Sequence, residues 1–340
     1  MLIIDGSYGE GGGQIIRSAI ALSVLTKKPV TINNIRSNRS NPGLRPQHFT
    51  AIKIMKTLCN AKTKNIKVGS SNIEFIPGIL EAGNYNFNIG TAGSIILVFQ
   101  TCILGCLKTK ASIKINLIGG TDVKWAPTWD YFEQVFLPLI KKMGVKCNAQ
   151  LIQRGYYPTG GGEAQITINP CEKVKPFNVS KKQDYKEVFG KIHLANLPEH
   201  IGTRMKHSAI KTLLKKNLKA QITIERATTS SAGTGITLWS KSDESIIGTT
   251  MLGEQGILSE KIGESAAKNL LSEINKGVSL DVYAFDQIIP YLSVIKNNDT
   301  SSFSVREISS HAQTNIWLVK QFLNADYNIK KLEDYVHITV

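Results

Sequence analysis

The sequence predicts an α+β protein in which one structural unit occurs three times, with a smaller domain inserted before the third unit. The 340 residues can bury a sizeable core, and 42% hydrophobic and 20% charged residues are typical of a soluble globular protein. The order helix, strand, helix, hairpin is found three times along the chain. The second helices begin near residues 44, 128 and 310, so about 84 and about 182 residues separate them, and about 98 extra residues precede the third unit.

Apolar residues at helical or alternating spacing predict the elements of the three units. The first unit is expected to contain strand 2–4, helix 14–26, strand 30–35, helix 46–59, and hairpin strands 66–68 and 72–76. The second is expected to contain strand 85–89, helix 91–107, strand 112–118, helix 127–143, and hairpin strands 145–152 and 162–168. The third is expected to contain helix 286–295, strand 302–308, helix 310–324, and hairpin strands 327–331 and 335–340.

The extra segment has a different order of elements, β-α-β-β-β-α, which is long enough to fold as its own small α/β domain. Its expected elements are strand 188–195, helix 203–218, strands 220–226, 235–240 and 245–251, and helix 261–275. We therefore divide the chain into a core at 1–180 and 277–340, with repeats at about 1–80, 81–180 and 277–340, and an insert at 181–276.

The charge balance favours an anionic partner. Lys and Arg number 41 against 26 Asp and Glu, which gives a net charge of +15 and indicates nucleic acid, nucleotides or an anionic membrane surface. A generally basic, lysine-rich proteome would explain the same excess.

The cysteines and the apolar runs bear on the compartment. The five cysteines have irregular spacings and are expected to be free thiols in a reducing compartment. The sequence shows no signal peptide and no apolar run of membrane-spanning length. A cytoplasmic protein without a membrane partner is therefore expected.

The most informative stretch is the first loop, which reads Asp5-Gly6-Ser7-Tyr8-Gly9-Glu10-Gly11-Gly12-Gly13-Gln14. Glycines let the backbone approach a bound group, and a helix start offers free N–H donors to an anion. Glu10 is the acid among the glycines and suits a divalent metal. No Gly-Lys-Ser/Thr follows as in a P-loop, and Gln14 replaces the last glycine of a dinucleotide fingerprint. The alternative is a tight turn that packs strand on helix.

His311 is the candidate nucleophile. It lies in the first turn of an expected helix that Ser309 or Ser310 can cap, where the helix dipole disfavours the imidazolium form. A neutral imidazole can attack phosphorus. The alternative is a histidine that only makes a hydrogen bond in the core.

Other polar and aromatic residues suit a nucleotide. The arginines Arg17, Arg36, Arg39 and Arg45 flank two helix starts and suit phosphate oxygens, although they would also form an ordinary basic rim. Gln100 lies among apolar residues of a helix, so its amide needs a partner. The run Tyr283-Ala284-Phe285-Asp286-Gln287 offers aromatics and an amide for a base, or ordinary packing.

Together these pieces resemble the RNA 3′-terminal phosphate cyclase family over the whole chain. The matching stretches are Asp5 to Arg17, Pro42-Gly43-Leu44-Arg45-Pro46-Gln47-His48, Gly119-Gly120-Thr121-Asp122, Tyr157-Pro158-x-Gly160-Gly161-Gly162, Asp286-Gln287 and His311-x-x-Thr314-Asn315. The resemblance implies three repeats of a four-stranded sheet with two helices and a small domain inserted before the third. This agrees with the spacing of the units.

The resemblance also implies a ligase activity in RNA processing. ATP converts an RNA 3′-phosphate end to a 2′,3′-cyclic phosphate: His311 is adenylylated through Nε2, AMP passes to the RNA phosphate, and the terminal 2′-hydroxyl expels it. Mg²⁺ or Mn²⁺ near Glu10 would neutralise the triphosphate. The residues that the resemblance assigns to ATP are Gln100, Tyr283, Ala284, Phe285, Asp286, Gln287, Pro127, Arg17, Arg36, Arg39 and Gln47. RNA with a 3′-phosphate end and ATP are the expected partners, and a homodimer is left open.

Three alternatives come from other classes of protein. Cyclase-like proteins that act in ribosomal RNA processing resemble these enzymes but lack the catalytic histidine, and here His311 is present. Enolpyruvyl transferases have similar repeats without the His-x-x-Thr-Asn helix. A plain RNA-binding module would explain the charge but not the residues gathered at helix starts.

Overall fold

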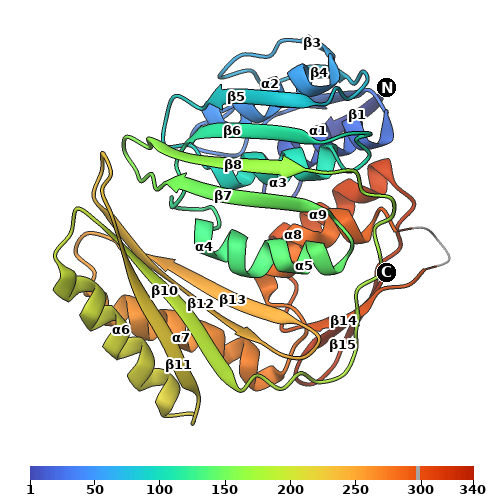
Figure 1. Cartoon of the computed structure of the whole chain (residues 1–340). Coiled ribbons are helices and arrows are strands. Elements are labelled where there is room, and N and C mark those ends of the chain that lie inside the picture. Colours follow the sequence, from blue (N-terminus) through green and yellow to red (C-terminus); the bar gives the residue numbers. More distant parts are fainter. Residues whose placement is uncertain (296–298) are drawn as a thin grey trace.

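The computed structural model describes residues 1–295 and 299–340 (Figure 1). Within these residues the chain forms four sheets of four strands each, and every sheet mixes parallel with antiparallel pairs. The predicted α+β class is therefore confirmed.

The first sheet has the strand order β1-β2-β4-β3. Its elements are β1 (Leu2–Asp5), α1 (Gly13–Thr26), β2 (Val30–Asn33), α2 (Pro46–Cys59), β3 (Lys62–Lys64) and β4 (Ile73–Ile76). The bounds of α2 are those expected. The strand expected at 66–68 is wrong: residues 65–70 form turns, with Gly69 at a φ of 88°, and Val68 is 52% exposed. An exposed valine in a turn gains little from a sheet, so the pairing strand is the earlier β3.

The second sheet repeats this order as β5-β6-β8-β7. Its elements are β5 (Gly83–Asn88), α3 (Ile95–Gly105), β6 (Ile113–Gly119), α4 (Trp129–Tyr131), a π-helical segment (Phe132–Phe136), α5 (Leu137–Lys142), β7 (Cys147–Gln153) and β8 (Gly162–Ile168). Helix α3 begins later than expected because Ser94 caps it and accepts a hydrogen bond from the backbone N–H of Leu97.

The third sheet has the order β15-β16-β14-β9. Its elements are β9 (Asn178–Val179), α8 (Val282–Leu292), β14 (Ser302–Val305), α9 (Ser310–Phe322), β15 (Asn328–Lys331) and β16 (Val336–Thr339). The short strand β9 was not expected, and it pairs in parallel with β14. Helix α8 begins before residue 286 because Asp281 caps it and accepts from the N–H of Ala284.

The fourth sheet lies between β9 and α8 in the sequence and has the order β11-β10-β12-β13. The segment contains β10 (Glu187–Ala195), α6 (Glu199–Leu214), β11 (Lys219–Ala227), β12 (Gly233–Lys241), β13 (Ile246–Leu252) and α7 (Ser259–Lys276). It has a cluster of buried apolar side chains of its own, which includes Ile192, Met205, Leu238 and Leu270. Figure 1 shows this segment at the lower left, with α6 beside α7.

The helices of the other three sheets share one larger core. Helix α1 packs against α3 and α9, and α8 packs against α9. The starts of α1 and α9 thereby meet, which positions the site described below. Among the described helices, none has both the length and the apolar character needed to cross a membrane.

Candidate active site

His311 lies in the first turn of α9 and is held by residues from the first loop. Ser309 caps the helix by accepting from the N–H of Ala312. The imidazole Nδ1 lies 2.7 Å from Oε1 of Gln14 and 3.1 Å from Oε2 of Glu10. The Gln14 side-chain nitrogen donates to the backbone oxygen of His311 at 3.4 Å, which orients the amide. Because an amide oxygen only accepts, Nδ1 carries the proton and Nε2 keeps its lone pair.

The surroundings favour a neutral imidazole. Desolvation lowers the pKa of His311, as do the charges of Arg17 and Arg39, while Glu10 acts in the opposite direction. Half of the His311 side chain stays exposed, so a ligand can approach it. The ring therefore has the protonation state and the access that a nucleophile requires.

Glu10 connects the glycine loop to α9. Its carboxylate accepts a hydrogen bond from the hydroxyl of Ser310 and lies 3.6 Å from the guanidinium of Arg39. The same carboxylate contacts His311, so a negative group, a cation and the candidate nucleophile lie together.

The start of α1 is arranged to receive an anion. Gly12 occupies the N-cap, and among the described residues no side chain caps the helix there, so its first N–H groups remain available. A Cβ on Gly13 would lie 1.9 Å from Nε2 of His48 and 2.9 Å from a guanidinium nitrogen of Arg17. Both side chains therefore lie directly against the glycine backbone.

His48 and Arg17, the two side chains against this helix start, both have lowered pKa values. Burial, followed by the charges of Arg17, Arg36 and Arg45, holds the pKa of His48 well below its usual range. Burial, with Arg36 nearby, lowers the pKa of Arg17 to about 10. Arg17 thus remains charged at neutral pH beside a neutral His48, and a bound anion would relieve the repulsion among the arginines.

Three of the residues expected to bind ATP, Gln100, Asp286 and Gln287, lie where α8 contacts α3 and α9. Gln100 donates to the side-chain oxygen of Gln287 at 2.5 Å, which gives Gln100 its partner. Asp286 accepts from the Ser309 hydroxyl at 2.6 Å, and its backbone oxygen accepts from Asn315. Burial raises the pKa of Asp286 to about 7.

The aromatic residues of this stretch have different environments. Tyr283 is 60% exposed, whereas Ala284 and Phe285 are fully buried. The Phe285 ring packs against Phe303 in the core, so ordinary packing explains it. Tyr283 alone of the two aromatics offers its ring to a ligand.

Gln47 and Pro127 lie at two other helix starts. The side-chain oxygen of Gln47 accepts from the N–H of Ser94, the residue that caps α3. Pro127 is partly exposed and precedes Thr128, which caps α4 and makes a hydroxyl contact with Thr237. Arg36 donates to the backbone oxygen of Asn41 within the basic loop.

Gln14 is the site residue that sequence reasoning missed. It belongs to the stretch Asp5 to Arg17 that resembles the family, but neither the resemblance nor the glycine pattern predicts a role for its side chain. Its position one residue into a helix that follows the glycine loop would have suggested a side chain near the ligand, but not its pairing with His311, which is 297 residues away.

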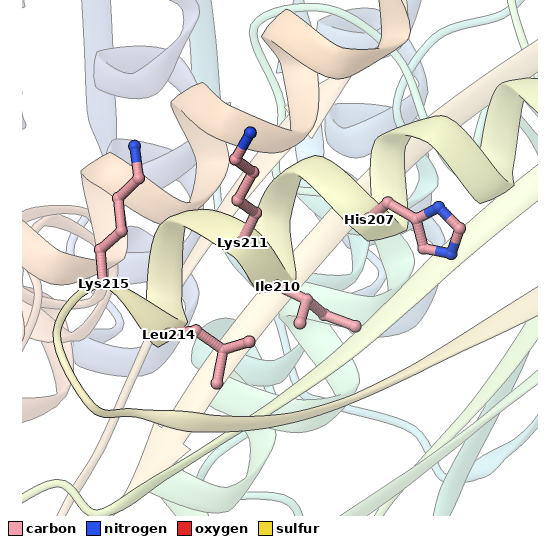
Figure 2. A pocket seen from close by; sticks show the side chains of 5 residues that line it. All are labelled: His207, Ile210, Lys211, Leu214 and Lys215. Carbon is pink, nitrogen blue, oxygen red and sulfur yellow. The ribbon is translucent and has the colours of Figure 1, made fainter.

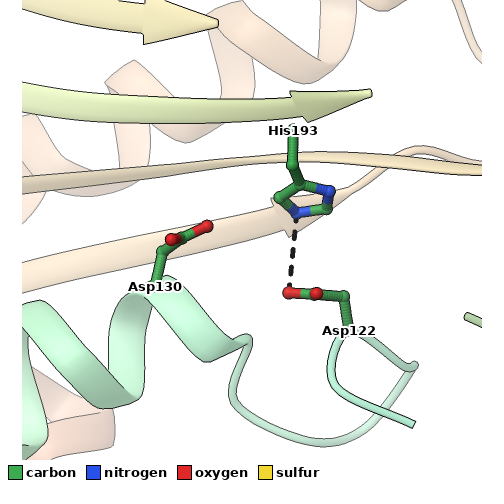
Figure 3. Close-up of side chains that lie close together, drawn as sticks. All are labelled: Asp122, Asp130 and His193. Atoms are coloured by element: carbon green, nitrogen blue, oxygen red, sulfur yellow. Dashed lines mark ion pairs between the residues drawn. The ribbon is translucent and has the colours of Figure 1, made fainter. Parts of the chain in front are cut away.

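A buried charged cluster joins the second sheet to the inserted segment (Figure 3). Asp122, Asp130 and His193 are spaced like metal ligands. However, the guanidinium of Arg154 lies 3.0 Å from Asp122 and 2.9 Å from Asp130, and Lys191 lies 3.2 Å from Asp130. These cations already neutralise the carboxylates, so the cluster is explained as an ion-paired connection between the two parts of the chain.

A hollow on the outer surface of α6 lies apart from these residues (Figure 2). It is lined by His207, Ile210, Lys211, Leu214 and Lys215. Four of them lie on α6 and Lys215 caps its C-terminal end, and none of the five is among the residues expected to bind ATP.

Comparisons with known proteins agree on one family. The family model described as RNA 3′-terminal phosphate cyclase matches residues 8–329. The chain is 43% identical over 340 residues to the RNA 3′-terminal phosphate cyclase of Methanococcoides burtonii, with all of both chains covered. It is 40% identical to that of Nitrosospira multiformis, covering 96% of this chain and 92% of the relative. It is 39% identical to that of Pyrococcus furiosus, covering 97% and 95%.

Proposed function

The chain belongs to the RNA 3′-terminal phosphate cyclase family, and we propose that it uses ATP to convert an RNA 3′-terminal phosphate to a 2′,3′-cyclic phosphodiester. The observation that carries this proposal is His311 at the start of α9, with its Nδ1 hydrogen-bonded to Gln14 and no hydrogen bond to Nε2 from the residues that the structure describes. The non-catalytic alternative in ribosomal RNA processing is not favoured, because the histidine and the glycine loop are both in place.

The first step transfers AMP to the protein. The Nε2 lone pair of His311 forms a bond to the α-phosphorus of ATP, the bond from that phosphorus to the bridging oxygen breaks, and pyrophosphate leaves. Gln14 keeps the proton on Nδ1 throughout. The free N–H groups of α1 and the guanidinium of Arg17 would hold phosphate oxygens, with Arg36 and Arg39 close by.

Two RNA steps follow. An oxygen of the RNA 3′-phosphate attacks the phosphorus of the adenylylated His311, and the P–N bond breaks. The neighbouring 2′-hydroxyl then attacks the activated 3′-phosphate and expels AMP. Because this attack is intramolecular, proximity lowers its barrier and a second protein nucleophile is not needed.

Glu10 fits a divalent metal that is shared with substrate. Its carboxylate is partly exposed and offers hard oxygen ligands, with the Ser310 hydroxyl beside it. Within residues 1–295 and 299–340, the group spaced like metal ligands does not include Glu10, so phosphate oxygens would complete the coordination. Mg²⁺ or Mn²⁺ bound there would neutralise triphosphate charge.

The adenine of ATP would lie beside α8. The exposed ring of Tyr283 suits stacking on one face of the base, with Pro127 on the other. The paired amides of Gln100 and Gln287 would read its edge, and Gln47 would support the same region from the start of α2.

The sheets also support a domain assignment. We infer three repeats at about 1–80, 81–180 and 277–340, each with two helices and a four-stranded sheet. The third sheet also takes strand β9 at Asn178–Val179, which precedes the insert. The segment 181–276 is an inserted domain. The shared order of the first two sheets and the separate apolar cluster of the segment support this division.

The nucleophile is tested with ATP labelled in the α-phosphate. His311→Ala and His311→Asn should fold and bind ATP but form no protein–AMP adduct, and the wild-type adduct should be labile to acid and stable to alkali. His337→Ala is the control, because His337 lies on β16 and contacts Ser302. An adduct retained in His311→Ala would overturn the assignment.

The order of the RNA steps is tested with a terminal 2′-deoxy sugar. Such an RNA should be adenylylated on its 3′-phosphate and then stop, because the attacking hydroxyl is missing. RNA with a 3′-hydroxyl end should not react. Cyclic product from the 2′-deoxy end, or no adenylylated RNA, would contradict this order.

A further inference from the structure

An aromatic pair lies at the surface beside this site and is not used by the steps above. The rings of Tyr8 and Trp317 stack with their centroids 3.8 Å apart and their planes at 12°. Tyr8 is 42% exposed and Trp317 is partly buried. Since Trp317 covers one face of the phenol ring, the exposed area belongs to its edge and its opposite face. A flat aromatic surface of this kind suits a nucleobase.

The glycine loop runs along α9, and this places the aromatic pair on the same helix as the candidate nucleophile. Three consecutive residues of the glycine loop contact successive turns of α9: Glu10 contacts Ser310, Gly9 packs on Thr314 and Tyr8 stacks on Trp317. Gly9 is required because its φ is 56° and a Cβ would lie 2.5 Å from the Thr314 hydroxyl.

The distance from the nucleophile is short on the scale of a nucleic acid. Trp317 follows His311 by six residues on α9, a rise of about 9 Å along the helix axis. A chain whose 3′-phosphate reaches His311 could therefore place a nearby base on Tyr8.

The charges beside the pair suit a nucleic-acid backbone. Asn38 of the basic loop donates to the backbone oxygen of Ser7, so this loop packs next to Tyr8. Arg39 from the same loop lies 3.4 Å from where a Cβ of Gly12 would be and keeps 42% of its side chain exposed. A cation for phosphate and an aromatic face for a base thus lie on one rim of the site.

We propose that Tyr8, supported by Trp317, is a stacking platform for a base near the 3′ end of the RNA. The proposal rests on the proposed function, because it takes the reacting phosphate to be at His311. The chemistry recognised is the flat face of a nucleobase, which both RNA and the adenine of ATP possess. The adenine is assigned to Tyr283 above, so the platform is assigned to RNA.

The two sources of base are separated by measuring two reactions. In the absence of RNA, Tyr8→Ala should adenylylate His311 with an unchanged KM for ATP. With RNA, its KM for the RNA should rise about tenfold or more, because one stacked base is lost. Tyr8→Phe should restore the wild-type values, and Tyr335→Ala, on the β15–β16 hairpin, should behave as wild type. A raised KM for ATP would assign the platform to adenine and overturn the proposal.

The second measurement is independent of turnover. RNA carrying 2-aminopurine at the terminal, the penultimate or a position far upstream is added to the protein. Its fluorescence should be quenched at one of the two end positions in the wild type and in Tyr8→Phe, but not in Tyr8→Ala. Equal quenching in all three proteins would overturn the platform. Because this signal needs no adduct, it remains informative if His311 proves not to be the nucleophile.

A purely structural role for the pair predicts a different result. If Tyr8 only fixes the glycine loop on α9, Tyr8→Ala should slow adenylylation without RNA by the same factor as the RNA reaction. That parallel loss, measured together with the melting temperature of each variant, would also refute the proposal.

Discussion

Gln14→Glu should make the adenylylation of His311 more sensitive to acid. The substitution keeps the shape of the side chain and an acceptor oxygen near Nδ1, which lies 2.7 Å from the amide oxygen now. It replaces a neutral acceptor by a negative charge. That charge stabilises the imidazolium, whose Nε2 carries a proton and cannot attack phosphorus.

The expected size follows from the geometry. An opposite charge within hydrogen-bonding distance raises a pKa by about 1–3 units, and the lower end applies because His311 is half exposed. On the acid side of the profile the rate follows the neutral fraction of the imidazole, so each unit lowers it about tenfold. Above both pKa values the two proteins should react at similar rates.

The assay is a single-turnover measurement of protein–AMP formation over about pH 5 to 9, the range in which histidine titrates. Gln313→Glu is the matched control, because it adds the same charge two residues along α9 on an exposed side chain. If the rate of protein–AMP formation falls at the same low pH in Gln14→Glu as in the wild type, the reasoning is refuted. A uniform loss at every pH would instead mean that Gln14 only holds the loop in place.

Three further outcomes are expected. Asp286→Asn should raise the melting temperature more at pH 8 than at pH 4: burial raises the pKa of Asp286 to about 7, so its ionisation destabilises the folded state as the pH rises from the unfolded value of about 4. Arg154→Met should lower the free energy of unfolding by about 3–5 kcal/mol, measured by denaturant titration, because two buried carboxylates lose their partner. Gly13→Ala should slow adenylylation at limiting ATP by displacing His48 and Arg17, whereas Gly12→Ala, whose Cβ would meet only Arg39 at 3.4 Å, should lose less.

The regular elements could be predicted from local pattern, but several of their ends could not. Apolar spacing gave the bounds of α2, and alternation gave β8. The starts of α3 and α8 depend instead on the capping side chains of Ser94 and Asp281, which apolar spacing does not reveal. Strand β9 has two residues and exists because β14 pairs with it from much later in the chain, so its own sequence carries no signal.

The candidate site shows the same limit. Residue type and position selected Glu10, Arg17, Arg39 and His311, and the family resemblance assigned their roles. The structure brings their side chains to one place, while these roles remain predictions. Gln14 was missed because its partner lies on the last helix of the chain.

The buried cluster was missed for a related reason. Asp122 was identified only as part of a motif, and its contact with Arg154 requires the loop after β6 to meet the residue that follows β7. Arg154 also pairs with Glu225 of the inserted segment. The sequence around each of these residues gives no sign of the cluster. Only the folded chain shows that the guanidinium of Arg154 neutralises buried carboxylates from separate segments.

The interruption of the third sheet has a consequence for the order of folding. During synthesis β9 leaves the ribosome long before its partner β14, so the two strands face the entropy of closing a long loop. The inserted segment 181–276, which lies between them, has its own apolar cluster, and a backbone hydrogen bond of 2.8 Å joins Gln183 near its start to Gly277 just after its end. Once this segment has folded, Gln183 and Gly277 are held together, so a much shorter loop remains to be closed between β9 and β14. Substitutions in its core should therefore delay the docking of α9, and with it the placement of the nucleophile, although they lie far from His311 in the sequence.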